Sequence, residues 1–356
     1  MTKKRVVVAM SGGVDSSVVA AMLHEQGYEV VGITLQLFDY GDAVSANQKT
    51  CCASKDVSDA GKVAEKIGFQ HYVLNYESVF KNEVIDDFID SYTKGFTPIP
   101  CVKCNQTVKF RDLYSIAKKL GAEFLATGHY VRKIDGIHGA EMHIGIDKTK
   151  DQSYFLFQTT KEQLEFLRFP LGGLAKTETR ELALKYGLEV HSKPDSQNIC
   201  FVPNGNYASV IEKYRPGSLD KGDIVEIASG AVIGEHNGTI NFTLGQRRGL
   251  GVSGESPLYV VKIDPQTNTV FVGEEKFLYH AKFEIENTNW LLNKNEELPH
   301  NLMARVRSSQ VEIPCKIEEN TITLFEPSKL ICPGQAAVLY DGERMLGGGF
   351  IKKILD

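Results

Sequence analysis

The 356 residues of the chain exceed the ~250–300 at which a single hydrophobic core stops growing, so we expect two or three domains. A composition of 42% hydrophobic and 24% charged residues, with 32 Gly and 12 Pro, excludes a disordered, collagen-like or coiled-coil chain. The formal net charge of -5 argues against a surface that is basic throughout and binds nucleic acid everywhere.

Strands and helices alternate through the first 130 residues. β-branched runs predict strands at 5–10, 28–37, 71–75 and 123–127. Periodic apolar positions predict helices at 16–26, 54–67, 79–92 and 107–120. This alternation is typical of a parallel sheet covered by helices on both faces, whose ligands bind beyond the carboxyl ends of the strands.

A different pattern begins after a stretch rich in Pro and Gly at 194–222. Short β-rich runs separated by Gly-containing turns continue to the C terminus and indicate one or two small antiparallel β domains. We therefore predict an α/β fold class with three domains. These are an N-terminal parallel-sheet domain at 1–205, a central β-rich domain at 206–280 and a C-terminal antiparallel β-barrel-like domain at 281–356.

The chain shows no sign of a membrane or secretory protein. No apolar run approaches the ~18 residues that span a bilayer, and the N-terminal MTKKRVVVAM has no cleavable small-residue site. Seven cysteines are an odd number in a chain too large to need disulfide bonds for stability. We therefore expect a reduced, cytoplasmic protein.

A glycine-rich loop joins the first predicted strand to the first predicted helix. It comprises Ser11, Gly12, Gly13, Val14, Asp15, Ser16 and Ser17. Two glycines allow a close approach of the backbone to a ligand, and the start of the helix offers N–H groups and the positive end of its dipole, so the loop suits a phosphate. An isolated turn of this kind can also place Ser16 or Ser17 as a helix cap. The loop has neither the lysine of a Walker motif nor the G-x-G-x-x-G pattern.

A basic window covers 94–133, where eight Lys and Arg residues stand against Asp112 and Glu123. Alone, such a run is most often a solvated helix face. Cys101 and Cys104 lie within it, before a predicted helix. The helix N terminus together with Lys103 and Lys109 predicts a lowered pKa for Cys104, as a nucleophile or metal ligand needs. A structural zinc site is disfavoured because the chain lacks a second C-x-x-C and histidines at finger spacing.

The remaining cysteines give weaker signals. Cys200 lies between Ile199 and Phe201, and by itself this context predicts a buried structural cysteine. We interpret the adjacent pair at 51–52 as packing residues, and Cys315 and Cys332 as core or incidental positions.

Five motifs in order give the chain a resemblance to a known family. They are SGGVDSS at 11–17, PIPCVKCNQTVKF at 98–110, ATGHY at 126–130, KDQSYFL at 150–156 and DSQNICF at 195–201. The first resembles the pyrophosphatase-type loop (PP-loop) of enzymes that split ATP into AMP and pyrophosphate, which implies an adenine nucleotide alpha hydrolase-like first domain. Together the motifs are similar to the tRNA-specific 2-thiouridylase family, and the match continues through TLGQRRGLG at 243–251 to PGQAAVLYD at 333–341.

The resemblance implies a tRNA sulfurtransferase that adenylates the wobble uridine and transfers sulfur from a cysteine persulfide, releasing AMP and pyrophosphate. It implies that Cys200 carries the persulfide and that Cys104 completes the transfer, leaving a Cys104–Cys200 disulfide for a reductant to reopen. ATP with Mg2+ is expected at residues 11–17, with Leu35 and Gly128 on the adenosine side. The implied tRNA contacts are Ile99, Pro100, Cys101, His129, Lys150, Asp151, Gln152, Arg307, Ser308 and Gln335.

The implied partners are tRNA, with the Lys, Glu and Gln acceptors expected, and a sulfur donor such as a cysteine desulfurase or a persulfide relay protein. Better-known members carry Asp where this chain has Cys101, which puts general-base help from that position in question. Cys101, Cys104 and Cys200 also leave an iron-sulfur cluster open as an alternative. Two different functions stay open as well: that of an argininosuccinate-type or amidotransferase-like synthetase, which needs no cysteine pair, and that of an RNA-binding module with a vestigial nucleotide site.

Overall fold

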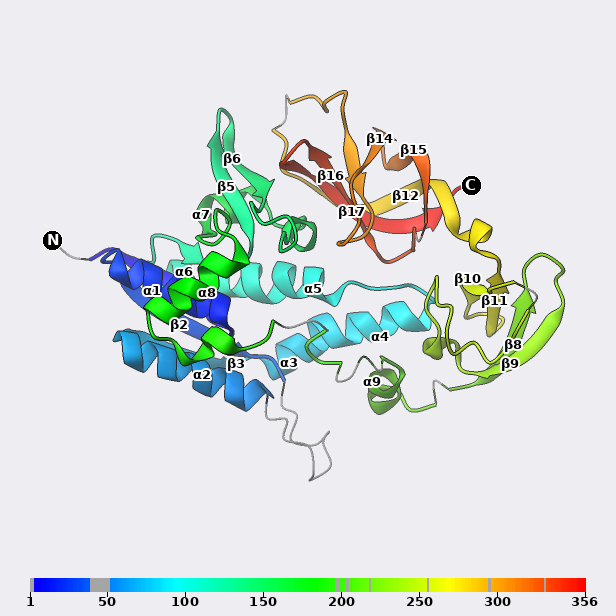
Figure 1. The fold of residues 1–356 in the computed structure, drawn as a ribbon, viewed down its shortest axis with the longest axis horizontal. Coiled ribbons are helices and arrows are strands. Elements are labelled where there is room, and N and C mark those ends of the chain that lie inside the picture. Colours follow the sequence, from blue (N-terminus) through cyan, green and yellow to red (C-terminus); the bar gives the residue numbers. More distant parts are fainter. Residues whose placement is uncertain are drawn as a thin grey trace.

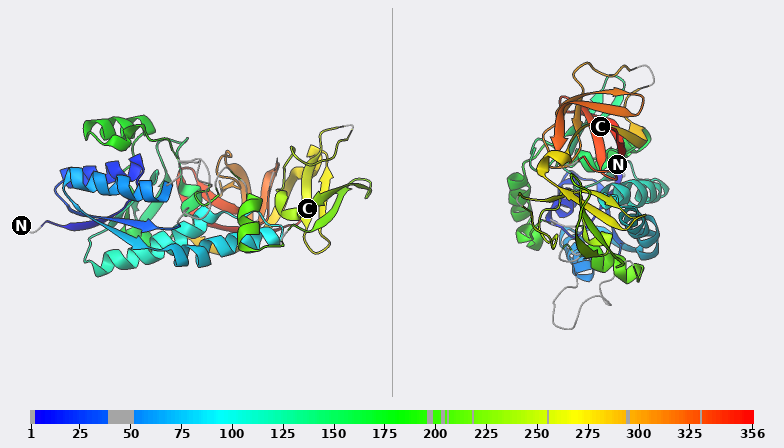
Figure 2. Two further views of the ribbon diagram at one scale, coloured as in Figure 1. Left: turned by 90° about the horizontal axis from the view of Figure 1, so that it is seen from below. Right: turned by 90° about the vertical axis from the view of Figure 1, so that its right-hand side faces the viewer.

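The computed structural model describes residues 3–38, 52–195, 199–202, 205, 207–217, 219–254, 256–293, 296–329 and 331–356. Figure 1 shows an elongated molecule, with the N-terminal α/β domain at the left, the central β-rich domain at the right and the C-terminal barrel above the helices between them. Figure 2 shows the same elongation from below. Within the described ranges, no helix is both long and apolar enough to cross a bilayer.

The N-terminal domain is built on a parallel sheet with the strand order β3-β2-β1-β4-β7. The strands are β1 (Arg5–Ala9), β2 (Glu29–Gln36), β3 (Gln70–Asn75), β4 (Leu125–Ala126) and β7 (Leu167–Arg168). Val6, Val7 and Val8 of β1 are fully buried because helices cover both faces of the sheet. The predicted parallel sheet is therefore confirmed.

The helices of this domain divide between the two faces of the sheet. Val6 and Val8 pack with helices α1 (Val14–Glu25), α2 (Cys52–Ile67) and α8 (Lys176–Lys185). Val7 points to the opposite face, where residues of a helical run at 100–119 cover it. That run consists of α5 (Pro100–Lys103), a π-helical stretch η2 (Cys104–Leu113) and α6 (Tyr114–Lys119).

A second helical layer extends from the sheet toward the central domain. It consists of α3 (Glu77–Phe80), the π-helical η1 (Lys81–Ile85), α4 (Asp86–Thr93) and α9 (Tyr207–Tyr214). Phe80 and Phe88 of this layer are completely buried, together with Val108 of η2. The layer therefore holds the first part of η2, where Cys104 lies, in an apolar environment.

The central domain is a sheet with the strand order β10-β11-β8-β9. Its strands are β8 (Lys221–Glu226), β9 (Val232–Asn237), β10 (Tyr259–Asp264) and β11 (Thr269–Gly273). The predicted β-rich central domain is confirmed, and its pairings are antiparallel apart from that of β11 with β8, which is parallel. The two strands are separated in the chain by β9, β10 and a long loop, which provides the crossover that a parallel pair needs.

The C-terminal strands form a closed antiparallel barrel. They are β12 (Tyr279–Trp290), β13 (Met303–Arg305), β14 (Ile313–Glu318), β15 (Thr321–Lys329), β16 (Ala336–Asp341) and β17 (Arg344–Ile354). Their order is β12-β15-β14-β13-β16-β17, and β17 pairs back with β12, which removes the open edges. The predicted barrel is confirmed.

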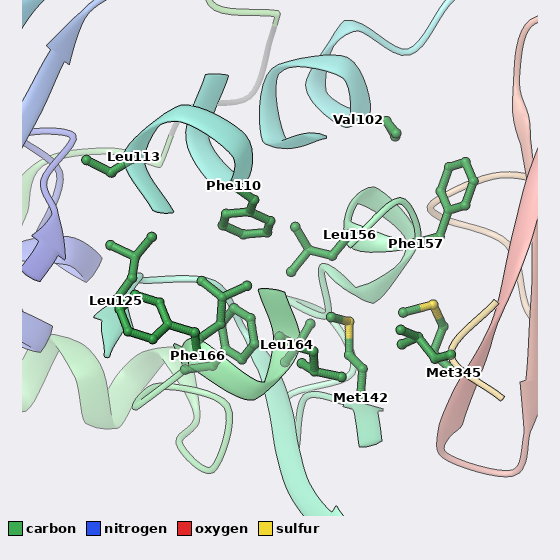
Figure 3. Close-up of a cluster of buried hydrophobic side chains, with 14 of the residues drawn as sticks. Val102, Phe110, Leu113, Leu125, Met142, Leu156, Phe157, Leu164, Phe166 and Met345 are labelled. Atoms are coloured by element: carbon green, nitrogen blue, oxygen red, sulfur yellow. The ribbon is translucent and has the colours of Figure 1, made fainter. Parts of the chain in front are cut away.

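A hairpin of the N-terminal half joins the barrel. Strands β5 (Val131–Gly136) and β6 (Gly139–Ile144) extend the barrel sheet through pairing of β6 with β17, where Met142 lies opposite Met345. Near them lie α7 (Lys161–Phe166) and the 3-10 turn η3 (Ser153–Leu156). Figure 3 shows side chains from η2, the hairpin and β17 gathered in one buried cluster. The α/β domain and the barrel thus share a continuous core, while the domain boundaries drawn from the sequence stay a prediction.

Candidate functional site

The glycine-rich loop passes tightly across the beginning of α2. Gly12 has a φ of +72°, and a Cβ atom on it would lie 2.1 Å from the backbone oxygen of Asp56, so that only glycine fits. Gly13 is the N-cap residue of α1, and no side chain makes a capping hydrogen bond at this end of the helix. Ser16 is not a cap either, because its Oγ accepts from the N–H of Ser11 at 3.1 Å. The first N–H groups of α1 have no intrahelical partner, which makes this end of the helix a site for an anion.

The other predicted nucleotide residues lie beside this loop. Gly128 follows β4, and a Cβ atom on it would be 2.9 Å from the backbone nitrogen of Ser16 and 3.0 Å from the Cβ of Asp15. Leu35 lies near the carboxyl end of β2, the strand next to β1. The structure therefore brings residues from three separate segments to one edge of the sheet, the edge at which parallel sheets bind ligands.

Asp15 of the loop is held by two residues, Lys176 and Tyr130, that were not among the predicted site residues. Lys176, the first residue of α8, places its Nζ 2.7 and 2.8 Å from the two carboxylate oxygens. The Tyr130 hydroxyl donates to Oδ1 at 2.9 Å. Tyr130 belongs to the ATGHY motif and was visible there, whereas the only sequence signal for Lys176 is a lysine before a predicted helix.

The thiol groups come together from distant parts of the chain. Cys101 and Cys104 lie in the first turns of the helical run, and Cys104 is buried. Phe201, which follows Cys200, packs in the same apolar cluster as Cys104. Its ring centroid lies 5.7 Å from that of Phe80 and 5.2 Å from that of Phe88. This packing carries Cys200 across about a hundred residues of sequence to the neighbourhood of Cys104.

The predicted lowering of the Cys104 pKa is wrong. Burial raises the pKa of Cys104, and this effect exceeds the opposing effect of Lys109. The pKa of Cys200 is raised to about 12 by surrounding protein atoms, although part of the residue is exposed, and by the neighbouring Cys104 and Cys101. Burial also raises the pKa of Cys101. The helix dipole and a nearby cation do not compensate for the loss of solvent around these thiols.

Lys109 and His129 lie with the cysteines. The Lys109 ammonium donates to Oδ1 of Asn105 at 3.0 Å. Its charge partly opposes the rise in the pKa of all three thiols. His129 bonds to Thr127 Oγ1 at 2.9 Å, and its ring meets the edge of Phe110. Burial and the charge of Lys109 lower the pKa of His129 to about 3, so that the ring is neutral. Lys109 therefore provides positive charge to a site that otherwise disfavours thiolates.

Several residues expected to contact tRNA already have partners within the protein. Lys150 pairs with Asp195 at 2.7 Å. The Asp151 carboxylate is almost fully buried and accepts from Arg305 at 2.7 Å. Gln152 accepts from the N–H of Tyr130 at 3.0 Å. These side chains hold the 150–152 segment in place.

The barrel brings the other expected contacts to the cysteine helix. Gln335 donates to the carbonyl of Thr97 at 2.9 Å, and the N–H of Thr97 donates to the carbonyl of Pro333 at 2.9 Å. The segment at 96–101, which includes Ile99, Pro100 and Cys101, therefore lies against the barrel. Arg307 donates to Cys332 at 2.9 Å, and Ser308 is exposed.

The basic window is less positive in the fold than in the sequence. Arg111 pairs with Glu83 and Asp112, and Arg132 pairs with Glu343. In the described ranges, no carboxylate lies within ion-pair distance of Lys109. No three His, Cys, Asp or Glu side chains of the described residues gather in an arrangement that would hold a metal ion. The cysteines as placed therefore do not fit the iron-sulfur alternative.

Proteins of known name resemble this chain over nearly its whole length. A relative from Rickettsia felis is 57% identical over 354 residues, which cover 98% of this chain and 96% of that protein. One from Rickettsia prowazekii is 56% identical over 353 residues, covering 97% of this chain and 98% of that protein. Each is named tRNA-specific 2-thiouridylase MnmA. The chain belongs to the tRNA-specific 2-thiouridylase MnmA family.

Family models divide this member of the MnmA family into three consecutive parts. A tRNA methyl transferase HUP domain matches residues 4–204, and a tRNA methyl transferase PRC-barrel domain matches 208–274. An aminomethyltransferase beta-barrel domain matches 280–351. The family resemblance inferred from the five motifs is thus confirmed. The descriptions of these models mention methyl transfer, whereas the named relatives are thiouridylases. An assay of activity must therefore distinguish a methylated uridine from 2-thiouridine.

Proposed function

We propose that this protein is a tRNA-uridine 2-sulfurtransferase that uses ATP to convert the wobble uridine of tRNA to 2-thiouridine. The observation that supports this most directly is that Phe201, the neighbour of Cys200, packs in the same apolar cluster as Cys104. Leu35, near the carboxyl end of the strand beside β1, also packs against this cluster. A ligase of the argininosuccinate type needs the loop and no cysteine pair. An RNA-binding module needs neither feature.

The first half of the reaction activates the uridine. The N–H groups at the start of α1 and the backbone of Gly12 and Gly13 bind the phosphates of ATP, and Asp15 lies where it would approach the Mg2+ that accompanies them. The O2 atom of uridine attacks the α-phosphorus, and pyrophosphate leaves. The product carries AMP on O2, which makes that oxygen a good leaving group.

The second half transfers sulfur. A sulfur donor transfers its persulfide sulfur to Cys200, which then carries a persulfide. The terminal sulfur of the Cys200 persulfide attacks C2 of the uridine, so that AMP departs with O2. The Cys104 thiolate then attacks Sγ of Cys200 and breaks the S–S bond, whose electron pair moves to the sulfur on C2. The products are 2-thiouridine and a Cys104–Cys200 disulfide, which a dithiol reductant reopens.

The chain's own residues supply what this transfer needs. Burial raises the pKa of Cys104 and so disfavours its thiolate, and the positive charge of Lys109 opposes this effect. Neutral His129 and the apolar rings around it exclude water from the activated uridine. The tRNA is held by basic residues from more than one domain, and its Lys, Glu and Gln acceptors are the substrates we propose. A cysteine desulfurase or persulfide relay protein is the proposed donor.

The test is the incubation of purified protein with ATP, Mg2+, a persulfide source and unmodified tRNA, followed by nuclease digestion and mass spectrometry. We expect 2-thiouridine, with pyrophosphate release that depends on tRNA. Cys104→Ser and Cys200→Ser should each abolish the product. Cys101→Asp should retain activity, and Cys315→Ala, in the barrel core, serves as the matched cysteine control.

Three results would contradict the proposal. Methylated uridine in place of 2-thiouridine would favour the activity in the family models' descriptions. Pyrophosphate release that depends on an amino acid and not on tRNA would favour a synthetase. Loss of activity in Cys101→Asp, with activity only in anaerobic protein that contains iron, would favour the cluster.

A further inference from the structure

We infer that Asp195 is a positioning residue that couples the nucleotide loop to the segment carrying Cys200. The inference rests on the proposed function, because it concerns how the adenylated uridine and the persulfide sulfur reach the same place. Neither the motif resemblance nor the loop geometry assigns a role to Asp195. Its position in the chain, five residues before Cys200, makes its contacts relevant to that thiol.

Three cations from two segments surround the Asp195 carboxylate. Lys150 Nζ lies 2.7 Å from Oδ2, and Lys176 Nζ and Arg180 Nη2 lie 2.9 and 3.0 Å from Oδ1. Lys176 and Arg180 belong to α8, which packs against α1 (Figure 1). Charge-assisted bonds of this kind are stronger and more directional than neutral hydrogen bonds. The carboxylate therefore fixes residue 195, five residues before Cys200 in the chain, on α8.

Lys176 extends this contact to the nucleotide loop. Its single ammonium group bridges Asp195 at 2.9 Å and Asp15 at 2.7 Å, and the residue is only 9% exposed. Asp15 stands in the first turn of α1, at the proposed phosphate site. A continuous chain of charges thus runs from the phosphate site through Lys176 to Asp195.

A second connection lies two residues before Asp195. The Lys193 ammonium donates to the backbone oxygen of Gly12 at 2.9 Å and pairs with Asp56 and Asp59 of α2 at 2.6 and 2.7 Å. The Arg180 guanidinium also donates to the carbonyl of Lys193 at 3.1 Å. Lys193 and Asp195 are therefore both connected to the glycine-rich loop, Lys193 through the carbonyl of Gly12 and Asp195 through Lys176 and Asp15.

These contacts predict a specific defect when the charge of Asp195 is removed. Asp195→Asn preserves the shape of the side chain and eliminates its attraction for the three cations, whereas Asp15 keeps Lys176 and the nucleotide loop in place. Pyrophosphate release should stay at the wild-type level. Sulfur transfer requires alignment of the persulfide with C2, and a displacement of about 1 Å costs up to ~100-fold in rate. We expect the yield of 2-thiouridine per pyrophosphate to fall about tenfold or more.

The experiment measures this ratio for wild type, Asp195→Asn, Asp195→Glu and a control, Glu25→Gln. Glu25 pairs with Lys185, also on α8, at 3.1 Å, far along the helix from Lys176. We expect Asp195→Glu to restore the ratio at least partly and Glu25→Gln to match wild type. A parallel readout is the rate of iodoacetamide alkylation of Cys200, measured by peptide mapping without ATP or tRNA, which should rise severalfold in Asp195→Asn and stay unchanged at Cys332.

The outcomes separate this inference from the proposed function. Wild-type protein that makes no 2-thiouridine refutes the proposed function, while the alkylation rates still test the position of Cys200. An unchanged ratio and alkylation rate in folded Asp195→Asn overturn the inference. A parallel loss of pyrophosphate release and thiolation also overturns it, because it indicates a general structural role. If Asp195→Asn does not fold, Arg180→Met, which removes one of the three cations, is measured in the same way with the same expectations.

Discussion

A methyl group at Gly12 should disturb the nucleotide loop by two separable effects. The φ of +72° places the residue in the left-handed region, which costs a non-glycine residue ~1–2 kcal/mol. The Cβ atom of Gly12→Ala would also lie 2.1 Å from the backbone oxygen of Asp56, and such overpacking costs ~1–3 kcal/mol. We therefore expect Gly12→Ala to lose about 2–5 kcal/mol of stability.

Two glycines at the ends of the same helix allow the effects to be separated. Gly27, which follows α1, has a φ of +89° and no atom within 4 Å of a built Cβ, so that Gly27→Ala reports the backbone cost alone. A Cβ on Gly13 meets only Ser11 Oγ, at 3.5 Å, an ordinary contact without left-handed backbone, and Gly13→Ala should change stability little.

The assay is thermal unfolding by calorimetry, with ATP binding measured on the folded variants. At ~2–4 °C per kcal/mol for a domain of this size, Gly12→Ala should lower the melting temperature by about 10 °C and Gly27→Ala by about 4 °C. ATP affinity should fall in Gly12→Ala and not in Gly27→Ala. Equal melting temperatures for Gly12→Ala and Gly27→Ala would show that the loop yields to the contact with α2, and would refute the steric argument.

Lys109→Met should raise the pKa of the Cys104 thiol and move its alkylation profile to higher pH, whereas Lys103→Met should not; equal shifts in both variants would contradict a specific role for Lys109. Arg247→Glu, on an exposed loop of the central domain, should weaken tRNA binding and reduce the slope of log affinity against log salt by about one, and an unchanged slope would exclude a phosphate contact. The pKa of His129 is lowered from its ordinary 6.5 to about 3, so between these pH values the unfolded chain binds a proton at His129 and the folded protein does not. The contribution of neutral His129 to the free energy of unfolding is therefore complete above pH 6.5 and is lost as the pH falls toward 3. His129→Gln should flatten this part of the stability profile in denaturant titrations, and a profile like that of wild type would count against a buried, neutral ring.

The local structure of this protein follows from neighbouring residues. The β-branched run at 5–10 becomes β1, and the loop and helix after it form where the two glycines and the periodic apolar residues predict them. The same is true of the predicted helices at 79–92 and 107–120, apart from their π-helical stretches. Such elements depend on backbone sterics and on apolar spacing over a few residues, both of which can be read directly from the sequence.

The tertiary structure alone decided the features that join distant segments. Nothing near Lys176 indicated its contacts with Asp15 and Asp195, and nothing in the β5–β6 hairpin indicated that it extends the barrel. The pKa of Cys104 shows the same limit: the charge of Lys109 was visible in the sequence, but the burial that outweighs it was not. The extent to which a group loses solvent depends on every segment that packs around it, and those segments come together only in the fold.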